Sequence, residues 1–409
     1  MKRAALYVTF LVPFLFGMSL FSGDPEIPAG EKAMQRTASE SNNIFMIKTY
    51  KLLTEEDKNI FISPFSISSA LAMTYAGSAG KTEEEMGSAL EFPKNDEQFH
   101  ENFGGLTNAI NDVSGKGDIQ LTIANSLWLA EGYKFLDSFL KTNKTHYKTE
   151  MTNLNFADSE KSRKTINDWV ADKTKDKIKE LIPQGILDAL TRLVLTNAVY
   201  FKAEWADQFK KGNTQPSEFF TYSGTVNADL MNIKKRFSYM ENDELQFLEM
   251  PYKGNDASMY ILLPRKKDGL KDIEKKLTWE DIEKYTNSMY SKEVDVHFPK
   301  FTMSLEYELS QLLTKLGMKA AFTKGADFSK MTGNKELYIS AVIHKTFIDV
   351  DEAGTEAAAA TAVVMRMKSA MPDPEFAVFK ADHPFFYFIK EKSTGTVLFA
   401  GRVIDPAKK

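Results

Sequence analysis

Helical spacing of apolar residues dominates the first half of the chain. Residues 63–77 begin with Ser-Pro, a favourable helix start, and carry small or apolar side chains on most faces, as a buried helix does. Residues 96–113 are amphipathic, with four apolar side chains on one face. Residues 161–182 combine mixed charges with one apolar stripe and end before Pro183. The pattern predicts three helices, of which the first is buried and the last lies at the surface.

Runs rich in β-branched and aromatic residues come between these helices and become more frequent toward the C-terminus. Because helices come early and strands late, the pattern predicts an α+β fold with helices packed on large mixed or antiparallel sheets. The predicted strands are residues 119–130, 190–203, 257–264, 293–304, 337–351, 385–391 and 396–403.

The N-terminus has the three parts of a secretory signal peptide. Lys2 and Arg3 form a basic start, residues 4–16 are apolar, and small residues follow. An uncleaved membrane anchor is the alternative, because the apolar run can be extended to Phe21, but Pro13 and the small residues favour cleavage. We expect secretion to the exterior or the cell envelope, with a signal peptide at 1–22, an N-terminal extension at 23–39 and a single domain at 40–409.

Composition adds constraints on function. The 409 residues are 43% hydrophobic and 12% aromatic, which allows a sizeable core. The net charge of −4 gives no electrostatic footprint for nucleic acid. The chain has no cysteine, so disulfides, a catalytic thiolate and cysteine-bound zinc are excluded.

Catalytic motifs are incomplete. Residues 77–82, "GSAGKT", resemble the end of a phosphate-binding loop, but Tyr75 stands where the motif needs glycine, and a junction between two helices explains them better. Ser138 and Lys141 fit S-x-x-K without the partner motifs. The dispersed histidines indicate hydrogen-bonded structural residues rather than a metal site or a serine–histidine pair, and we expect neither an enzyme nor a cofactor. They are His100, His146, His297, His344 and His383.

The segment "GTEAAAATA" at residues 354–362 is made almost wholly of small residues. Alanine favours helix, but the strand-like run before the segment and the two prolines of "MPDPEF" after it favour extended backbone. A period of two gives one small, uncharged face, so the segment could slide between two existing strands. That face holds Thr355, Ala357, Ala359, Thr361 and Val363, and the opposite face holds Glu356, Ala358, Ala360 and Ala362.

From about residue 40 to 406 the chain resembles the serpins, a family of serine protease inhibitors. The stretch "EAGTEAAAATA" resembles the hinge of inhibitory serpins, "ADHPFFYFI" the C-terminal signature and "LFAGRV" the closing strand. Further similar blocks are "NIFISPFSISSALAM", "LTNAVYFKAEW" and "ADFSKM". Within the family, the chain resembles secreted bacterial members. The resemblance implies helices around three β-sheets, with an exposed reactive-centre loop at about 352–375.

The resemblance also implies a mechanism. A protease attacks the exposed loop and forms an acyl-enzyme, and the cleaved loop then inserts as a new strand in the main sheet, which traps the protease. The inhibitor is therefore a suicide substrate with a metastable fold, acting as a monomer without a cofactor. A non-inhibitory serpin acting as a carrier or chaperone is the alternative. Such members tend to have bulky or charged hinge residues, and the small face of this hinge has none.

The scissile bond follows from the family's spacing. Counting Glu352 as the first residue, the seventeenth is Lys368, followed by Ser369. Lysine suits a trypsin-like pocket with a carboxylate at its base. Arg366 is a second basic candidate, and Met367 would suit elastase- or subtilisin-like proteases.

Further residues match family positions one by one. The hinge is Glu352, Gly354, Thr355, Glu356, Ala357, Ala358, Ala359, Ala360 and Thr361. The shutter, a buried polar cluster where the main sheet opens, is Ser63, Ser66, Asn197 and His344. The breach, where insertion begins, is Trp205 and Lys300, and the lysine matches an ion pair with Glu352. Residues 96–113 carry no Lys or Arg, so polyanion activation through this helix is not expected.

Overall fold

The computed structural model describes residues 37–115, 119–355 and 376–408. The predicted signal peptide, residues 23–36 of the predicted extension and loop residues 356–375 lie outside these ranges. Among the described residues, no helix has the length and apolar character needed to cross a bilayer.

The helices begin where the sequence supplies caps. Helix α3 starts at Pro64, and the Ser63 side chain accepts a hydrogen bond from the Ser66 backbone N–H at 3.3 Å. The helices are α2 (Ala38–Leu53), α3 (Pro64–Tyr75), α4 (Gly80–Leu90), α5 (Glu97–Gly115), α6 (Asp137–Thr142), α7 (Ser159–Lys173), α8 (Leu270–Lys276), α9 (Trp279–Asn287), α10 (Ser310–Lys315) and α11 (Ser329–Thr332). The shorter helical segments are the π-helix η1 (Asn143–Tyr147) and the 3₁₀-helices η2 (Lys211–Asn213) and η3 (Ala320–Phe322).

Most strands are largely buried, as their apolar composition requires. They are β1 (Ile60–Ile62), β2 (Ile119–Ala130), β3 (Glu150–Leu154), β4 (Leu193–Glu204), β5 (Gln215–Thr221), β6 (Gly224–Glu241), β7 (Leu245–Pro251), β8 (Ala257–Pro264), β9 (Tyr290–Pro299), β10 (Phe301–Glu308), β11 (Ile339–Val350), β12 (Gly354–Thr355), β13 (Ala377–Lys380), β14 (Phe385–Glu391) and β15 (Val397–Val403).

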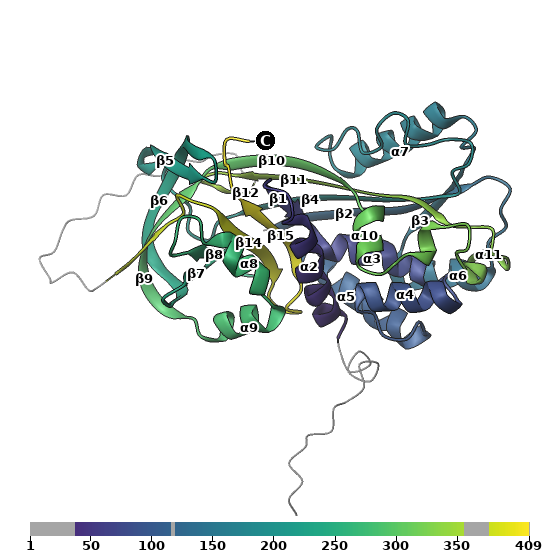
Figure 1. The fold of residues 1–409 in the computed structure, drawn as a ribbon, viewed down its shortest axis with the longest axis horizontal. Coiled ribbons are helices and arrows are strands. Elements are labelled where there is room, and N and C mark those ends of the chain that lie inside the picture. Colours follow the sequence, from purple (N-terminus) through teal and green to yellow (C-terminus); the bar gives the residue numbers. More distant parts are fainter. Residues whose placement is uncertain (1–36, 116–118, 356–375, 409) are drawn as a thin grey trace, which may run out of the picture.

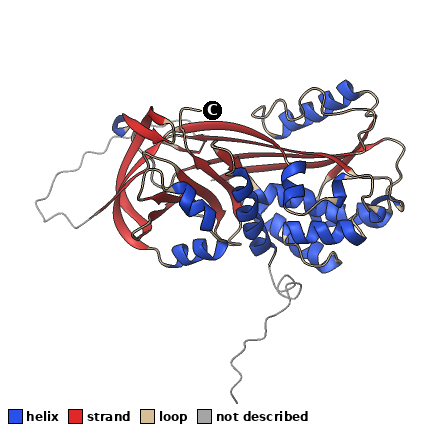
Figure 2. Cartoon of the chain, in the orientation of Figure 1, coloured by secondary structure: helices blue, strands red, loops and turns tan. Residues whose placement is uncertain are grey.

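The strands form two hydrogen-bonded sheets within the described chain. A six-stranded sheet has the order β10-β11-β12-β4-β2-β3, and a nine-stranded sheet runs β1-β15-β14-β8-β7-β6-β9-β13, with β5 on β6. The resemblance implied three sheets, but the described strands form two. Two of the expected sheets are joined by β6, which is long enough to pair with β5 at its start and with β7 at its end. The long strands of the six-stranded sheet run along the molecule, with α3, α4, α5 and α6 on one face and α7 on the other (Figure 1). Figure 2 shows the same separation of helices from strands.

Two predicted elements have the wrong boundaries. The helix predicted at 161–182 ends at Lys173, because Lys175 and Asp176 both take left-handed backbone conformations that an α-helix cannot continue. Ile178 stays buried because the chain folds back over the sheet. The strand predicted at 293–304 is two strands, which pass from the nine-stranded into the six-stranded sheet at Lys300.

Other predictions hold within a few residues. The junction predicted at 77–82 is confirmed, since α3 ends at Tyr75 and α4 begins at Gly80. The predicted strands 119–130, 190–203 and 337–351 correspond to β2, β4 and β11, which lie side by side in the six-stranded sheet. This sheet holds the candidate site.

Candidate functional site

The boundary between β4 and β11, here called the seam, is closed along most of its length and open at one end. β11 and β4 pair directly in parallel from Ile339 and Leu193 to Thr346 and Val199. Beyond that point β12 lies between them and pairs with both in the antiparallel sense. Gly354 and Thr355 have therefore already entered the sheet as the first two residues of an additional strand.

The packing at β12 favours small residues. A side-chain carbon on Gly354 would lie 2.6 Å from the Glu204 Cα and would clash with the Ala203 carbonyl oxygen. Thr355 is fully buried, and its hydroxyl pairs with the hydroxyl of Tyr252 at 2.9 Å. The side chain of Thr355 therefore points into the core, on the face that the period of two assigned to it.

Trp205, the predicted breach residue, covers the end of the seam. Its ring stacks on Tyr252 with 4.7 Å between centroids, and its indole N–H donates to the Asp351 carbonyl at 3.0 Å. Its backbone N–H donates to the Ala353 carbonyl at 2.9 Å. Trp205 therefore holds the chain at the point where it turns into β12.

Glu352 and Lys300 are brought together beside Trp205. The Lys300 ammonium donates to Glu352 Oε2 at 2.9 Å, and the Thr214 hydroxyl donates to Oε1 at 2.7 Å. Burial opposes ionisation of Glu352, but these hydrogen bonds prevail and lower the pKa of its carboxyl. The carboxylate fixes the start of the hinge.

The four predicted shutter residues also lie together, beneath the closed part of the seam. The Ser63 backbone N–H donates to His344 Nε2 at 3.0 Å, and His344 Nδ1 pairs with Asn197 Oδ1. The Asn197 amide donates to the Ser66 hydroxyl and, at 2.5 Å, to Asn125 Oδ1. His344 and Asn197 stand on β11 and β4, so their hydrogen bond crosses the seam.

The geometry requires neutral His344. Its Nε2 accepts a hydrogen bond from a backbone N–H, and complete burial lowers the pKa of the imidazole to about 3. Protonation of His344 would put an N–H on Nε2. Two hydrogen-bond donors, this N–H and the Ser63 backbone N–H, would then face each other.

We expect the intact protein to lose stability as the pH falls from about 6.5 toward 3. The unfolded state binds a proton at position 344 in this range and the folded state does not, so this contribution is complete above pH 6.5. The slope from one such group is at most about 1.4 kcal/mol per pH unit. Melting temperatures measured from pH 7 to 4.5 should fall more steeply for the wild type than for His344→Gln.

His100 needs a control, because burial also lowers its pKa, to about 4. A His100→Gln variant should keep the part of the pH dependence that belongs to His344. Equal slopes for the wild type and His344→Gln would contradict the role of the neutral shutter histidine.

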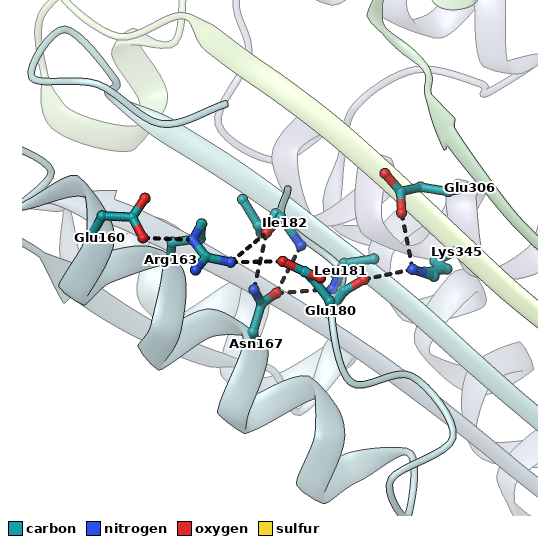
Figure 3. A network of polar contacts seen from close by, with 8 residues as sticks. All are labelled: Glu160, Arg163, Asn167, Glu180, Leu181, Ile182, Glu306 and Lys345. Carbon is teal, nitrogen blue, oxygen red and sulfur yellow. Dashed lines mark hydrogen bonds and ion pairs between the residues drawn. The ribbon is translucent and has the colours of Figure 1, made fainter. Parts of the chain in front are cut away.

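Residues 174–182, here called the strap, lead back from α7 over the seam. The strap and α7 bury Ile166, Val170, Ile178, Leu181 and Ile182 against side chains of β2, β4 and β11. Asn167 accepts from the Leu181 and Ile182 N–H groups at 2.9 and 2.8 Å, and Lys345 on β11 donates to the Glu180 carbonyl at 2.6 Å (Figure 3). A strand entering the seam therefore has to pass beneath the strap.

Several predicted site residues lie outside the described residues. Glu356 and residues 357–361 of the hinge belong to this group, as do the bait residues Arg366, Met367, Lys368 and Ser369. Their roles stay predictions.

Sequence reasoning missed Tyr252, Thr214 and Asn125. Each acts through a hydrogen bond between distant parts of the chain, which no local spacing indicates.

The five histidines are all hydrogen-bonded, as predicted. His100 contacts Tyr147 and Asn95, and His146 contacts Glu97. His297 accepts from the Asn232 amide at 3.3 Å, and His383 pairs with Asp382 at 2.8 Å.

Comparison with known proteins agrees with this geometry. The model of the family Serpin (serine protease inhibitor) matches residues 40–406. The leukocyte elastase inhibitor of Bos taurus is 40% identical, over 90% of this chain and 99% of its own, and Serpin B8 of Homo sapiens shows the same identity and coverage. The crystal structure of human thyroxine-binding globulin complexed with thyroxine superposes with a TM-score of 0.81 at 31% identity, covering 90% of this chain and 98% of that one.

The fold and the seam define a protein whose six-stranded sheet admits two residues, Gly354 and Thr355, between the neighbouring strands β4 and β11. The protein belongs to the serpin family. Its fold is the serpin fold, and its family is one of protease inhibitors rather than catalysts.

Proposed function

We propose that the protein inhibits trypsin-like serine proteases as a suicide substrate. The serine hydroxyl of the protease attacks the carbonyl carbon of Lys368, the bond to the Ser369 nitrogen breaks, and that nitrogen leaves as an amine with the proton from the serine. An ester then joins the protease to Lys368. The freed loop enters the seam and carries the protease along before the ester is hydrolysed.

The position of β12 carries this proposal. Thr355 faces Val350 on β11 and Ala203 on β4. Because both pairings are antiparallel, each further residue of a strand in this register would face an earlier residue of β11 and of β4. Thr361, six residues later, would then face His344 and Asn197. Thr361 would separate these two residues and so break the hydrogen bond that crosses the seam. The shutter would thus open at the position that a small residue of the loop's inward face reaches.

The identity of the target depends on the bait residue. Lys368 favours a protease with a carboxylate in its specificity pocket. Leukocyte elastase inhibitors are among the relatives of this chain, and Met367 would supply an elastase-like protease with an apolar residue one position earlier. We therefore propose trypsin-like proteases as principal targets and elastase-like proteases as secondary ones.

A covalent complex is the direct test. The mature chain is incubated with trypsin, and separately with elastase, and the products are separated on a denaturing gel. An inhibitor gives a band that combines protease and inhibitor. A carrier or chaperone is instead cleaved without such a band, and that result would overturn the proposal.

We expect Lys368→Ala to slow the inhibition of trypsin by at least a hundredfold. The carboxylate of the specificity pocket loses its ionic partner, and such differences of a few kcal/mol correspond to factors of this size. Arg366→Ala is the matched control, since it removes a basic side chain two residues away and should change little. Unchanged inhibition by Lys368→Ala, with the cut mapped after Arg366 or Met367, would reject the bond between Lys368 and Ser369.

A further inference from the structure

A hollow of about 540 Å³ lies beside β10, the edge strand of the six-stranded sheet. One wall is the end of α2, the loop that follows it and Ile60 of β1, and the other is the last part of β10 with α10 (Figure 1). The described residues of the shutter and the breach do not line it. Binding sites for small molecules have this size.

Part of the lining is apolar. Leu52 and Leu53 on α2 and Leu305 on β10 are half-buried and line the hollow. Four buried apolar residues complete this part of the lining, namely Ile60, Leu309, Leu312 and Ile404. An alkyl chain that enters the hollow would therefore exchange water for apolar contacts.

The loop that forms one wall is held from beneath by a buried charge. Arg402 is fully buried, and it donates from Nε to the Lys58 carbonyl at 3.0 Å and from Nη1 to Glu274 Oε2 at 2.9 Å. The Tyr50 hydroxyl donates to Glu274 Oε1 at 2.5 Å. Because a buried charge without its partner is costly, these bonds keep the loop in one position. A ligand meets a wall that needs little ordering on binding.

The end of the chain is held against the same loop. Asn59 Nδ2 donates to the Asp405 carbonyl at 2.8 Å, and Asn59 Oδ1 accepts from the Ile404 N–H at 2.9 Å. Between the two walls, Lys315 on α10 pairs with Glu55 of the loop at 2.7 Å, and both side chains are more than half exposed. An exposed pair of this kind contributes little to stability, so a ligand can part it at small cost.

The charges around the hollow favour a cation. Five carboxylates and three ammonium groups line it, namely those of Glu55, Glu56, Asp57, Glu306 and Glu308 and those of Lys58, Lys315 and Lys408. Each of the three lysines is paired with a carboxylate. The Glu308 carboxylate accepts from the Ser310 backbone N–H at 3.0 Å and from the Ser310 hydroxyl, and no cation of the described chain pairs with it. Glu308 is therefore available to a positively charged ligand.

We propose that this hollow binds a long-chain primary amine. The ammonium group pairs with Glu308 through a charge-assisted hydrogen bond, and the alkyl chain lies along Leu52, Leu53 and Leu305. A fatty acid of equal length would have to displace the partner of a lysine and would bring a second negative charge close to Glu308. The hollow is separate from the seam, so this inference does not depend on the proposed function.

Calorimetric titration of the mature chain with decylamine, kept below the concentration at which it forms micelles, tests the site. We expect saturable binding at a single site and no binding of decanoate. Octylamine should bind roughly fifteenfold more weakly, because each buried methylene corresponds to about a factor of four. Glu308→Gln should weaken decylamine binding about tenfold, since it keeps the shape of the side chain and removes its charge.

Variants of the apolar lining test the position of the alkyl chain. Leu305→Ser should weaken decylamine binding about tenfold, and Leu53→Ser should do the same from the other wall. Melting temperatures establish that each variant is folded, and either leucine variant suffices if the other does not fold. The matched control is Glu160→Gln, which removes an exposed carboxylate on α7, outside the hollow, and should leave the affinity unchanged.

Three results would overturn the site. The first is a wild type that takes up no decylamine. The second is decanoate that binds as tightly as decylamine, because the charge would then play no part. The third is equal affinity of the wild type and Glu308→Gln, which would mean that decylamine binds elsewhere on the chain.

Discussion

Cleavage of the reactive loop should raise the melting temperature of the protein by an amount on the order of 20 °C. Among the described residues of the intact chain, Gly354 and Thr355 lie between β4 and β11 in the seam. About a dozen further residues would join the sheet after cleavage, and at about 1 kcal/mol per ladder hydrogen bond they add on the order of 10 kcal/mol. In a chain of this size each kcal/mol corresponds to about 2 °C.

Calorimetry of the intact and the cleaved chain checks this prediction. An ordinary nick in an exposed loop removes a constraint and does not stabilise a fold, so a large rise has to come from new structure. The matched control is a chain cleaved at the same bond with arginine in place of Thr355, which should melt close to the intact protein. Equal melting temperatures for intact and cleaved wild type would mean that no strand is added.

Local pattern was enough to predict the elements that build the seam. β2, β4 and β11 are apolar runs with few interruptions, and α3 has its cap and its proline at the expected places. The family spacing then placed His344, Asn197, Ser63 and Ser66 in one cluster, and Glu352 beside Lys300. These contacts join positions from 52 residues apart, for Lys300 and Glu352, to 281 residues apart, for Ser63 and His344, so only the resemblance could suggest them.

The errors arose where tertiary contacts override local pattern. The apolar stripe of 161–182 continues past Lys173 because the strap buries Ile178 and Leu181 on the same sheet, although the backbone is no longer helical. The strand β6 was missed because its basic stretch at 234–236 is solvent-exposed and interrupts the alternation of burial. Tyr252 was missed because its partner, Thr355, lies 103 positions later in the chain.

Thr355→Arg should convert the inhibitor into a substrate. Thr355 is fully buried between β11 and β4, and its hydroxyl bonds to that of Tyr252, which is itself buried. An arginine there would place a charge in the core without a partner, which costs several kcal/mol. The charge therefore keeps the start of the loop out of the seam and slows insertion, while Lys368 remains available to the protease. The acyl-enzyme then has time to hydrolyse.

Stoichiometry separates this outcome from simple loss of binding. With the wild type, about one molecule should inhibit one molecule of trypsin. With Thr355→Arg, each molecule of trypsin should cut many molecules of the variant at the same bond and be released active, with no covalent band. Glu356→Arg is the matched control, because it places the same charge on the opposite face of the strand, where the period of two leaves it in water. Thr355→Val keeps the shape but leaves the Tyr252 hydroxyl without its partner, and its stoichiometry should lie between the two. If Thr355→Arg and the wild type form the covalent complex to the same extent, insertion does not begin at β12, and the inward face assigned to Thr355 and the alanines after it is wrong.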